Sequence, residues 1–255
     1  MLLAIDIGNS HIVIGGFRGA HLSLHFRLAT DLRKTEDEYG LLLKSLLGQR
    51  RIKGVALASV VPILTEVLRR ATERHLGLDA LVVTAACMTG LQIPVEAETI
   101  GADRLANMVA AYTRLGSPVM IADFGTATTL TVVGPRGKYL GGAIAPGLAT
   151  CAEALTCRTA QLPPVPSPLS APSTVIGRDT RSAIESGLFW GQVGLIEEIM
   201  RRLKKAMKTA PLTVVATGGF AEQIAPACPS IAKIEPHLTL IGLRLIYSMN
   251  RPGKT

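Results

Sequence analysis

One short pattern occurs twice in this chain and constrains its fold more than any other feature. Near the N-terminus, an apolar run leads into Asp6-Ile7-Gly8-Asn9-Ser10, and in the middle of the chain a second apolar run leads into Asp123-Phe124-Gly125-Thr126. In each copy the glycine permits a tight backbone turn, and the aspartate stands beside N–H groups that are free to bind an anion. The pattern predicts two strand–turn–strand hairpins, each suited to hold a phosphate group and a cation.

The order of the elements around the two copies also repeats. The first half predicts a meander of three strands, then alternating helices and strands, over residues 2–7, 11–17, 22–28, 35–48 (helix), 55–58, 63–76 (helix), 81–84 and 103–115 (helix). The second half repeats that order over residues 118–123, 128–133, 138–143, 147–157 (helix), 180–207 (helix) and 213–216. We therefore expect an α/β protein with two related domains, residues 1–117 and 118–255.

Composition narrows the class of protein. With 255 residues and 48% apolar content, the chain can bury a sizeable core. Asp6 interrupts the first apolar run and no run reaches spanning length, which predicts a cytoplasmic protein that does not enter a membrane. The four cysteines show neither C-x-x-C spacing nor nearby histidines, so we expect reduced thiols and no zinc site.

The formal net charge of +8 suits an anionic substrate, and it would also suit weak non-specific binding of nucleic acid. The densest basic cluster lies at the end of the predicted helix 180–207, where cations favour the helix C-terminus. We therefore expect a solvated last turn there in preference to a nucleic-acid interface; the cluster comprises Arg201, Arg202, Lys204, Lys205 and Lys208.

A second candidate site is Gly101-Ala102-Asp103-Arg104, at the start of a predicted helix. Asp103 could serve as a catalytic base or only as a helix cap, and Arg104 could clamp a carboxylate or phosphate. Thr180, where the long helix begins, is either an N-cap or a ligand contact. The chain lacks the G-x-x-x-x-G-K-[ST] run, so it is not a P-loop enzyme.

Taken together, these segments resemble the type III pantothenate kinases, which belong to the superfamily of actin, sugar kinases and heat-shock chaperone ATPases. The resemblance extends along nearly the whole chain, through DIGNS (6–10), SVVP (59–62), GADRLAN (101–107), DFGTATT (123–129), IGRDT (176–180) and ATGG (216–219). It implies two ribonuclease-H-like lobes with ATP bound in an interlobe cleft. It also implies a phosphotransferase that converts pantothenate to 4′-phosphopantothenate, the first step of coenzyme A biosynthesis.

The resemblance assigns roles residue by residue. ATP phosphates would contact Asp6, Ile7, Gly8, Asn9, Ser10, His11 and Thr126. Asp6 would lie near Mg²⁺, and Asp123 would hold a monovalent cation, K⁺ or NH₄⁺. Asp103 would be the general base, in a pantothenate site formed with Gly101, Ala102, Arg104 and Thr180. Thr180 would come from the neighbouring subunit of a homodimer.

Two positions depart from the family pattern: His11 follows the first turn, and Pro94 stands where a tyrosine that lines the substrate site is expected. Two other functions stay open from sequence: a nucleotide-binding transcriptional accessory protein, and a kinase for another small hydroxy-acid or sugar.

Overall fold

The computed structural model describes residues 1–95, 99–165, 169–207 and 212–251. It divides into two compact units. Unit 1 comprises Met1–Thr113 together with the segment from Leu238 onward, and unit 2 comprises Arg114–His237. The predicted division at 117/118 differs from this one mainly at the C-terminus, because the last helix, α7 (Leu238–Asn250), packs against strands β1 and β4 of unit 1.

In the described residues of unit 1, five strands form one mixed sheet in the order β3-β2-β1-β4-β5. β1 pairs antiparallel with β2, which pairs antiparallel with β3, whereas β1, β4 and β5 run parallel. The strand bounds are β1 Leu2–Ile7, β2 His11–Arg18, β3 His21–Ala29, β4 Gly54–Ser59 and β5 Ala80–Val82. The predicted three-strand meander and the strands that follow it are confirmed.

The described part of unit 2 repeats this sheet, in the order β8-β7-β6-β9-β10 with the same alternation of antiparallel and parallel pairs. Its strands are β6 Val119–Phe124, β7 Ala127–Val133, β8 Tyr139–Pro146, β9 Thr213–Thr217 and β10 Lys233–Ile234. Because β1 and β6 occupy equivalent central positions, Asp6 and Asp123 lie at equivalent places near the carboxyl ends of these strands. The two sheets confirm the duplication that the sequence predicts.

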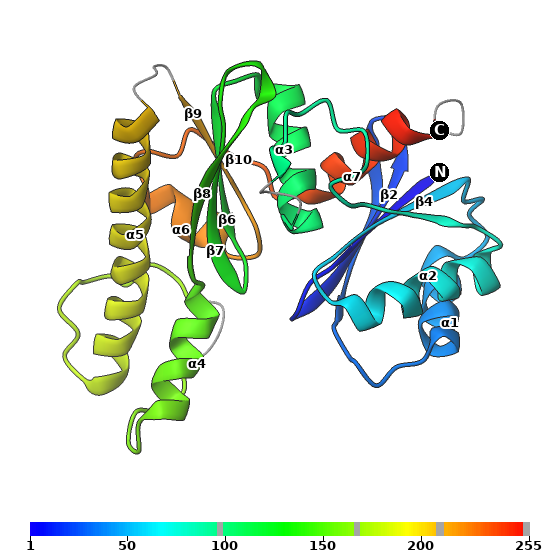
Figure 1. The fold of residues 1–255 in the computed structure, drawn as a ribbon. Helices are drawn as coiled ribbons and strands as arrows, with labels where there is room; N and C mark the ends of the chain where they lie inside the picture. The colour runs from blue at the N-terminus through cyan, green and yellow to red at the C-terminus, as the bar shows by residue number, and fades with distance from the viewer. Residues whose placement is uncertain (96–98, 166–168, 208–211, 252–255) are drawn as a thin grey trace. The chain divides into compact units, whose positions relative to one another are not determined.

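Helices α1 (Glu36–Leu47) and α2 (Pro62–Leu76) lie side by side in unit 1 (Figure 1). Thr35 caps α1 in a capping box with Glu38, and Pro62 occupies the first turn of α2, where its missing N–H costs nothing. The two helices cover one face of the sheet, whose core includes Ile5, Ile7, Ile12 and Ile14. Helices α7 and α3 (Ala102–Leu115) are joined by a hydrogen bond of 2.9 Å from Thr239 Oγ1 to Asn107 Oδ1.

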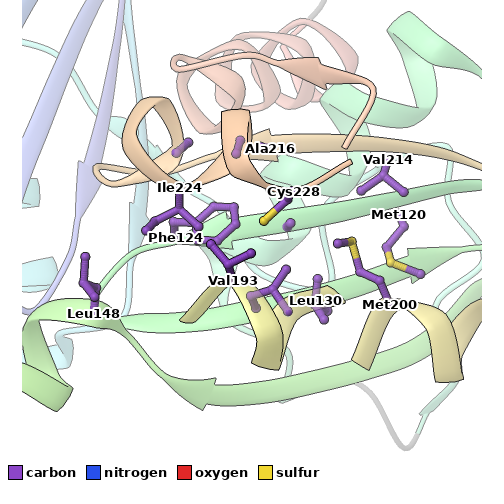
Figure 2. Close-up of a cluster of buried hydrophobic side chains, with 14 of the residues drawn as sticks. Met120, Phe124, Leu130, Leu148, Val193, Met200, Val214, Ala216, Ile224 and Cys228 are labelled. Atoms are coloured by element: carbon purple, nitrogen blue, oxygen red, sulfur yellow. The ribbon is translucent and has the colours of Figure 1, made fainter. Parts of the chain in front are cut away.

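The core of unit 2 forms where helices meet the sheet. Side chains of α5 (Thr180–Met207), among them Val193 and Met200, point toward Phe124 and Leu130 of the strands (Figure 2). Leu148 of α4 (Leu148–Arg158) and Ile224 of α6 (Ala221–Ile224) complete this layer. The packing fixes the strand β6 that ends at the second Asp-x-Gly turn.

The basic end of α5 is partly neutralised within its own helix. Glu198 Oε2 accepts from Arg201 Nε and Glu198 Oε1 from Arg202 Nε, each at 2.7 Å. Lys208, the last member of the cluster, lies outside the described residues. These i,i+3 and i,i+4 pairs are typical of a solvated helix face. None of the helices in the described residues has the length and apolar character that crossing a membrane requires.

Candidate active site

The first Asp-x-Gly turn, residues Gly8–Ser10, connects β1 to β2. The N–H of Gly8 donates to the His11 carbonyl at 3.0 Å, and a Cβ at Gly8 would approach that same oxygen to 3.1 Å. Thr30, just after β3, closes the turn from outside: its hydroxyl donates to the Gly8 carbonyl at 2.7 Å and its N–H to the Ser10 carbonyl at 3.1 Å. Asn9 and Ser10 are left exposed at the tip. A fixed backbone with exposed polar groups suits an anion such as phosphate.

Asp103 lies near this turn, on the first residues of α3. The parallel pairing of β1 with β4 ends with Ile7 opposite Ser59, and the N–H of Val60 donates to the Ile7 carbonyl at 3.1 Å. A Cβ at Gly101 would lie 3.6 Å from Val60 Cγ1 and 2.5 Å from Asp103 Oδ1. Val60, in the β4–α2 connection, therefore contacts both the end of β1 and Gly101, two residues before Asp103, so Asp103 lies near the edge of the unit 1 sheet where β1 ends.

Burial raises the pKa of the Asp103 carboxyl above its ordinary value of 3.8, because the charged form loses solvation. The N–H of Arg104 donates to Asp103 Oδ1 at 2.7 Å and, with the Arg104 charge, opposes that shift. This carboxylate is thus more basic than an exposed aspartate while one oxygen is held in place. Those are the properties of a general base that removes a proton from an alcohol.

The second Asp-x-Gly turn, Gly125-Thr126, is one residue shorter than the first. The Gly125 N–H donates to the carbonyl of Ala127, two residues later, at 3.2 Å. In the first turn, the Gly8 N–H donates to the carbonyl of His11, three residues later. The Thr126 carbonyl accepts from the Gly147 N–H at 3.0 Å and from the Thr150 hydroxyl at 2.7 Å. The start of α4 therefore braces this turn, as Thr30 braces the first.

The Asp123 carboxylate lies against the turn that follows β9. Gly218 adopts φ +94°, and a Cβ there would overlap Asp123 Oδ1 and the backbone of Phe124. The Phe220 N–H donates to the Phe124 carbonyl at 3.1 Å. The sequence marks this segment only as ATGG (216–219), without a role, and its close approach to Asp123 links it to the second turn.

Thr180 is not the N-cap of α5. Asp179 caps the helix instead: Asp179 Oδ1 accepts from the Ser182 N–H, and the Asp179 carbonyl from the Ala183 N–H, both at 2.9 Å. Aspartate is among the best N-caps, and here it stands directly before the first helical residue. Thr180 is exposed, so of the two roles that the sequence left open the structure excludes capping.

Two residues that depart from the family pattern are both exposed. Pro94 lies in the segment before α3. His11 begins β2, and its Nδ1 lies 3.0 Å from Arg27 Nη2 on β3. The sequence motifs mark neither Thr30 nor Arg27, which meet the first turn and β2 through the pairing of β2 with β3. Val60 lies within the SVVP segment (59–62), to which the sequence assigned no role.

Among the described residues, no group of three or more His, Cys, Asp or Glu side chains is arranged to hold a metal ion. A Mg²⁺ ion bound by one carboxylate needs no such group, since it takes its other ligands from substrate phosphates and water. Asp6 beside the exposed turn fits that pattern. Asp123, held next to a backbone turn, fits a site in which carbonyl oxygens and one carboxylate share a cation.

Residues 2–202 match the family model described as type III pantothenate kinase. The chain belongs to the type III pantothenate kinase family. Two relatives with that name are those of Brevibacillus brevis, 45% identical over 98% of this chain and 100% of the relative, and Moorella thermoacetica, 44% identical over the same shares. As a kinase family, type III pantothenate kinases imply ATP as the phosphoryl donor and a divalent cation.

Solved structures support the fold. A conserved Baf family protein of Campylobacter jejuni has a TM-score of 0.63 at 20% identity, covering 97% of this chain and 98% of the other. A ROK family glucokinase of Streptomyces griseus, in complex with glucose and AMPPNP, has a TM-score of 0.52 at 11% identity, covering 95% and 97%. At these identities the likeness concerns architecture alone, and it confirms the expected actin-like and sugar-kinase fold for this type III pantothenate kinase family member.

Proposed function

We infer that this chain transfers the γ-phosphoryl group of ATP to the 4′-hydroxyl of pantothenate, which begins coenzyme A biosynthesis. Family membership over nearly the whole chain supports the reaction. The single structural observation that carries the mechanism is the position of Asp103, a half-buried carboxylate on the first turn of α3 whose Oδ1 is held by the Arg104 N–H, next to the connection that contacts the end of β1.

In this mechanism Asp103 accepts the proton of the attacking hydroxyl as its oxygen bonds to the γ-phosphorus. The bond from the γ-phosphorus to the β,γ-bridging oxygen breaks, and ADP leaves with the electron pair. The backbone N–H of Arg104 keeps the accepting carboxylate oriented. Gly101, Ala102 and Arg104 line the pantothenate side, where the guanidinium of Arg104 pairs with the pantothenate carboxylate. The residues Asp6, Ile7, Gly8, Asn9, Ser10, His11 and Thr126 hold the phosphate chain of ATP.

Phosphoryl transfer depends mainly on positioning and on neutralising the charge of the phosphates, and needs little covalent chemistry from the protein. Cations supply that neutralisation. Mg²⁺ bound near Asp6 would screen the phosphate oxygens. Asp123 would hold a monovalent cation, K⁺ or NH₄⁺, against the turn at Gly218. The close approach of the Gly218 backbone to the Asp123 carboxylate supports this assignment, since it puts polar main-chain groups beside that side chain.

We place Thr180 in the pantothenate site of the partner subunit in a homodimer. Its exposure, and the capping of α5 by Asp179, support a role in contact with a ligand outside its own helix.

The test is direct. Purified protein with ATP, Mg²⁺ and K⁺ should convert pantothenate to a product heavier by one phosphate, detected by mass spectrometry. A panel of small hydroxy-acids and sugars, offered at the same concentration, should give much slower turnover. Faster turnover of another acceptor would show that pantothenate is not the substrate, and absence of any phosphotransfer would refute the proposal.

A further inference from the structure

Arg27 shares a sheet face with Asp6. The strand register places Asp6 opposite Val13 and Val13 opposite Arg27, so the three residues form one row across β1, β2 and β3. Residues directly opposite each other on paired strands point to the same face of a sheet. Strands lie about 4.8 Å apart, which puts the Arg27 and Asp6 Cα atoms at a spacing of about 10 Å.

Helix α7 covers only part of this face. It packs at Gly15, where an added Cβ would overlap the Leu240 side chain. The guanidinium carbon of Arg244 lies 5.9 Å from the centroid of the Phe17 ring. Closer to the Asp-x-Gly turn, Val13 is partly buried, and His11 and Arg27 are exposed. Along β1 and β2 the face is therefore covered least at the end that carries the Asp6 turn, and the residues of β3 on this face are exposed along the whole strand.

The contact between His11 and Arg27 fixes the protonation of the imidazole. A guanidinium has only N–H donors, so His11 Nδ1, 3.0 Å from Arg27 Nη2, must accept the hydrogen bond. The ring is then neutral, and its proton lies on Nε2. Burial, with the nearby Arg27 charge, lowers the pKa of His11 in keeping with this state. Arg27 is thus oriented by a neutral partner that leaves its positive charge in place.

We propose that Arg27, oriented by His11, binds the phosphate chain of the nucleotide. A guanidinium matches phosphate oxygens in a bidentate geometry, and a long arginine side chain on the Asp6 row can reach a phosphate chain held at the Asp6 turn. The Nε2–H of His11 supplies a second donor on the same side of the turn. This inference rests on the proposed function for the location of ATP, but it assigns a new phosphate ligand from β3.

The experiment measures dissociation constants by isothermal titration calorimetry, with Mg²⁺ at fixed ionic strength, for ATP and for adenosine. Arg27→Gln is compared with Arg18→Gln, a matched control that removes the same charge from the exposed far end of β2. We expect Arg27→Gln to weaken ATP binding about tenfold or more, as for a charge-assisted hydrogen bond, and to leave adenosine binding within about twofold. Arg18→Gln should match the wild type for both ligands.

Two further variants refine the result. Arg27→Lys should recover only part of the ATP affinity, because an ammonium lacks the planar fork. His11→Ala should weaken ATP binding less than Arg27→Gln does, since it releases the arginine without removing it. Thermal unfolding of each variant verifies that the fold persists.

Several outcomes would overturn the inference: ATP affinity of Arg27→Gln equal to that of Arg18→Gln, an equal loss for adenosine and ATP, or no ATP binding by the wild type. A wild type that binds ATP but does not phosphorylate pantothenate would refute the proposed function alone, and a selective loss of ATP affinity in Arg27→Gln would still support the phosphate ligand.

Discussion

Asp103 combines two features that a general base needs, and both come from its position on the first turn of α3. Burial raises its pKa, and the Arg104 N–H holds one carboxylate oxygen. Asp6 and Asp123, by contrast, lie at strand ends beside glycine turns, where cations and phosphates can approach. The same residue type is thus suited to different tasks by its surroundings: Asp103 to proton transfer, and Asp6 and Asp123 to binding cations and phosphates.

The pH dependence of the reaction rate should reflect the pKa of the Asp103 carboxyl. The base acts as a carboxylate, so the rate falls as the pH drops through its pKa, which lies above the ordinary 3.8. We expect kcat/KM to show an acid limb centred above pH 3.8. His11→Gln should retain this limb. Loss of the limb in that variant would assign the titration to His11 instead.

Gly218 should tolerate no side chain. At φ +94° an L-residue is strained by about 1–3 kcal/mol, and its Cβ would also push against the Asp123 carboxylate. We expect Gly218→Ala to lower both the thermal unfolding midpoint and the activity. The control is Gly19→Ala, at φ +60° with open space around it, which should cost stability only. Equal activity in the two variants would contradict the role of the turn at Asp123.

Sequence could predict some of these residues and not others. Asp6, Gly8 and Asp123 stand out because the motif recurs, and Asp103 because it begins an amphipathic helix. Arg27, by contrast, reaches the site through the register of β2 with β3, and Gly218 through a turn more than ninety positions from Asp123. Such non-local pairings leave no periodic signal in the chain.

At the scale of elements, apolar periodicity predicted most helices and strands as far as β9, but none of α6, β10 and α7. The predicted helix 35–48 corresponds to α1 (Glu36–Leu47), and the predicted helix 180–207 to α5 (Thr180–Met207). The packing of α7 on unit 1 was not predicted. An apolar stripe shows that a helix has a buried face, but it does not show which sheet covers that face.

The contact between α1 and α2 depends on Gly40. A Cβ there would overlap the His75 imidazole, which Asp37 holds through a 2.7 Å contact between His75 Nε2 and Asp37 Oδ1. We expect Gly40→Ala to destabilise unit 1 by about 1–2 kcal/mol, because overpacking outweighs the better helix propensity of alanine.

The effect of Gly40→Ala on stability should reverse once the His75 imidazole is removed. In a His75→Ala background, Gly40→Ala should stabilise by about 0.5–1 kcal/mol, the propensity gain alone. Urea unfolding of the four proteins in this cycle measures both effects. Destabilisation of similar size in both backgrounds would show that His75 is not the constraint.

At the scale of the whole molecule, the duplicated sheet explains why the motif occurs twice. Each unit places an Asp-x-Gly turn after its central strand, and each braces that turn with a hydroxyl from elsewhere, Thr30 in one unit and Thr150 in the other. The net charge of +8 fits polyanionic ATP, and the pairing of Glu198 with Arg201 and Arg202 argues against the end of α5 as a nucleic-acid interface.

A mixed-dimer assay tests whether Thr180 serves the partner's site. Asp103→Asn and Thr180→Ala subunits are combined after dissociation, each nearly inactive alone. If Thr180 acts across the interface, half of the dimers are mixed and each has one intact site, which restores about a quarter of wild-type activity. If Thr180 acts within its own subunit, mixing should restore nothing. Chromatography of the mixture must show that dimers form.

The most direct test of the central claim is the single-turnover rate of pantothenate phosphorylation by Asp103→Asn with both substrates bound. We predict a loss of about 10²–10⁴-fold, with ATP affinity unchanged. The folded-state pKa of Asp103 is raised, so its stabilising contribution declines as pH rises through that pKa. At neutral pH the asparagine variant should therefore unfold at the same temperature or higher. A well-folded Asp103→Asn protein that phosphorylates pantothenate at the wild-type rate would contradict the account.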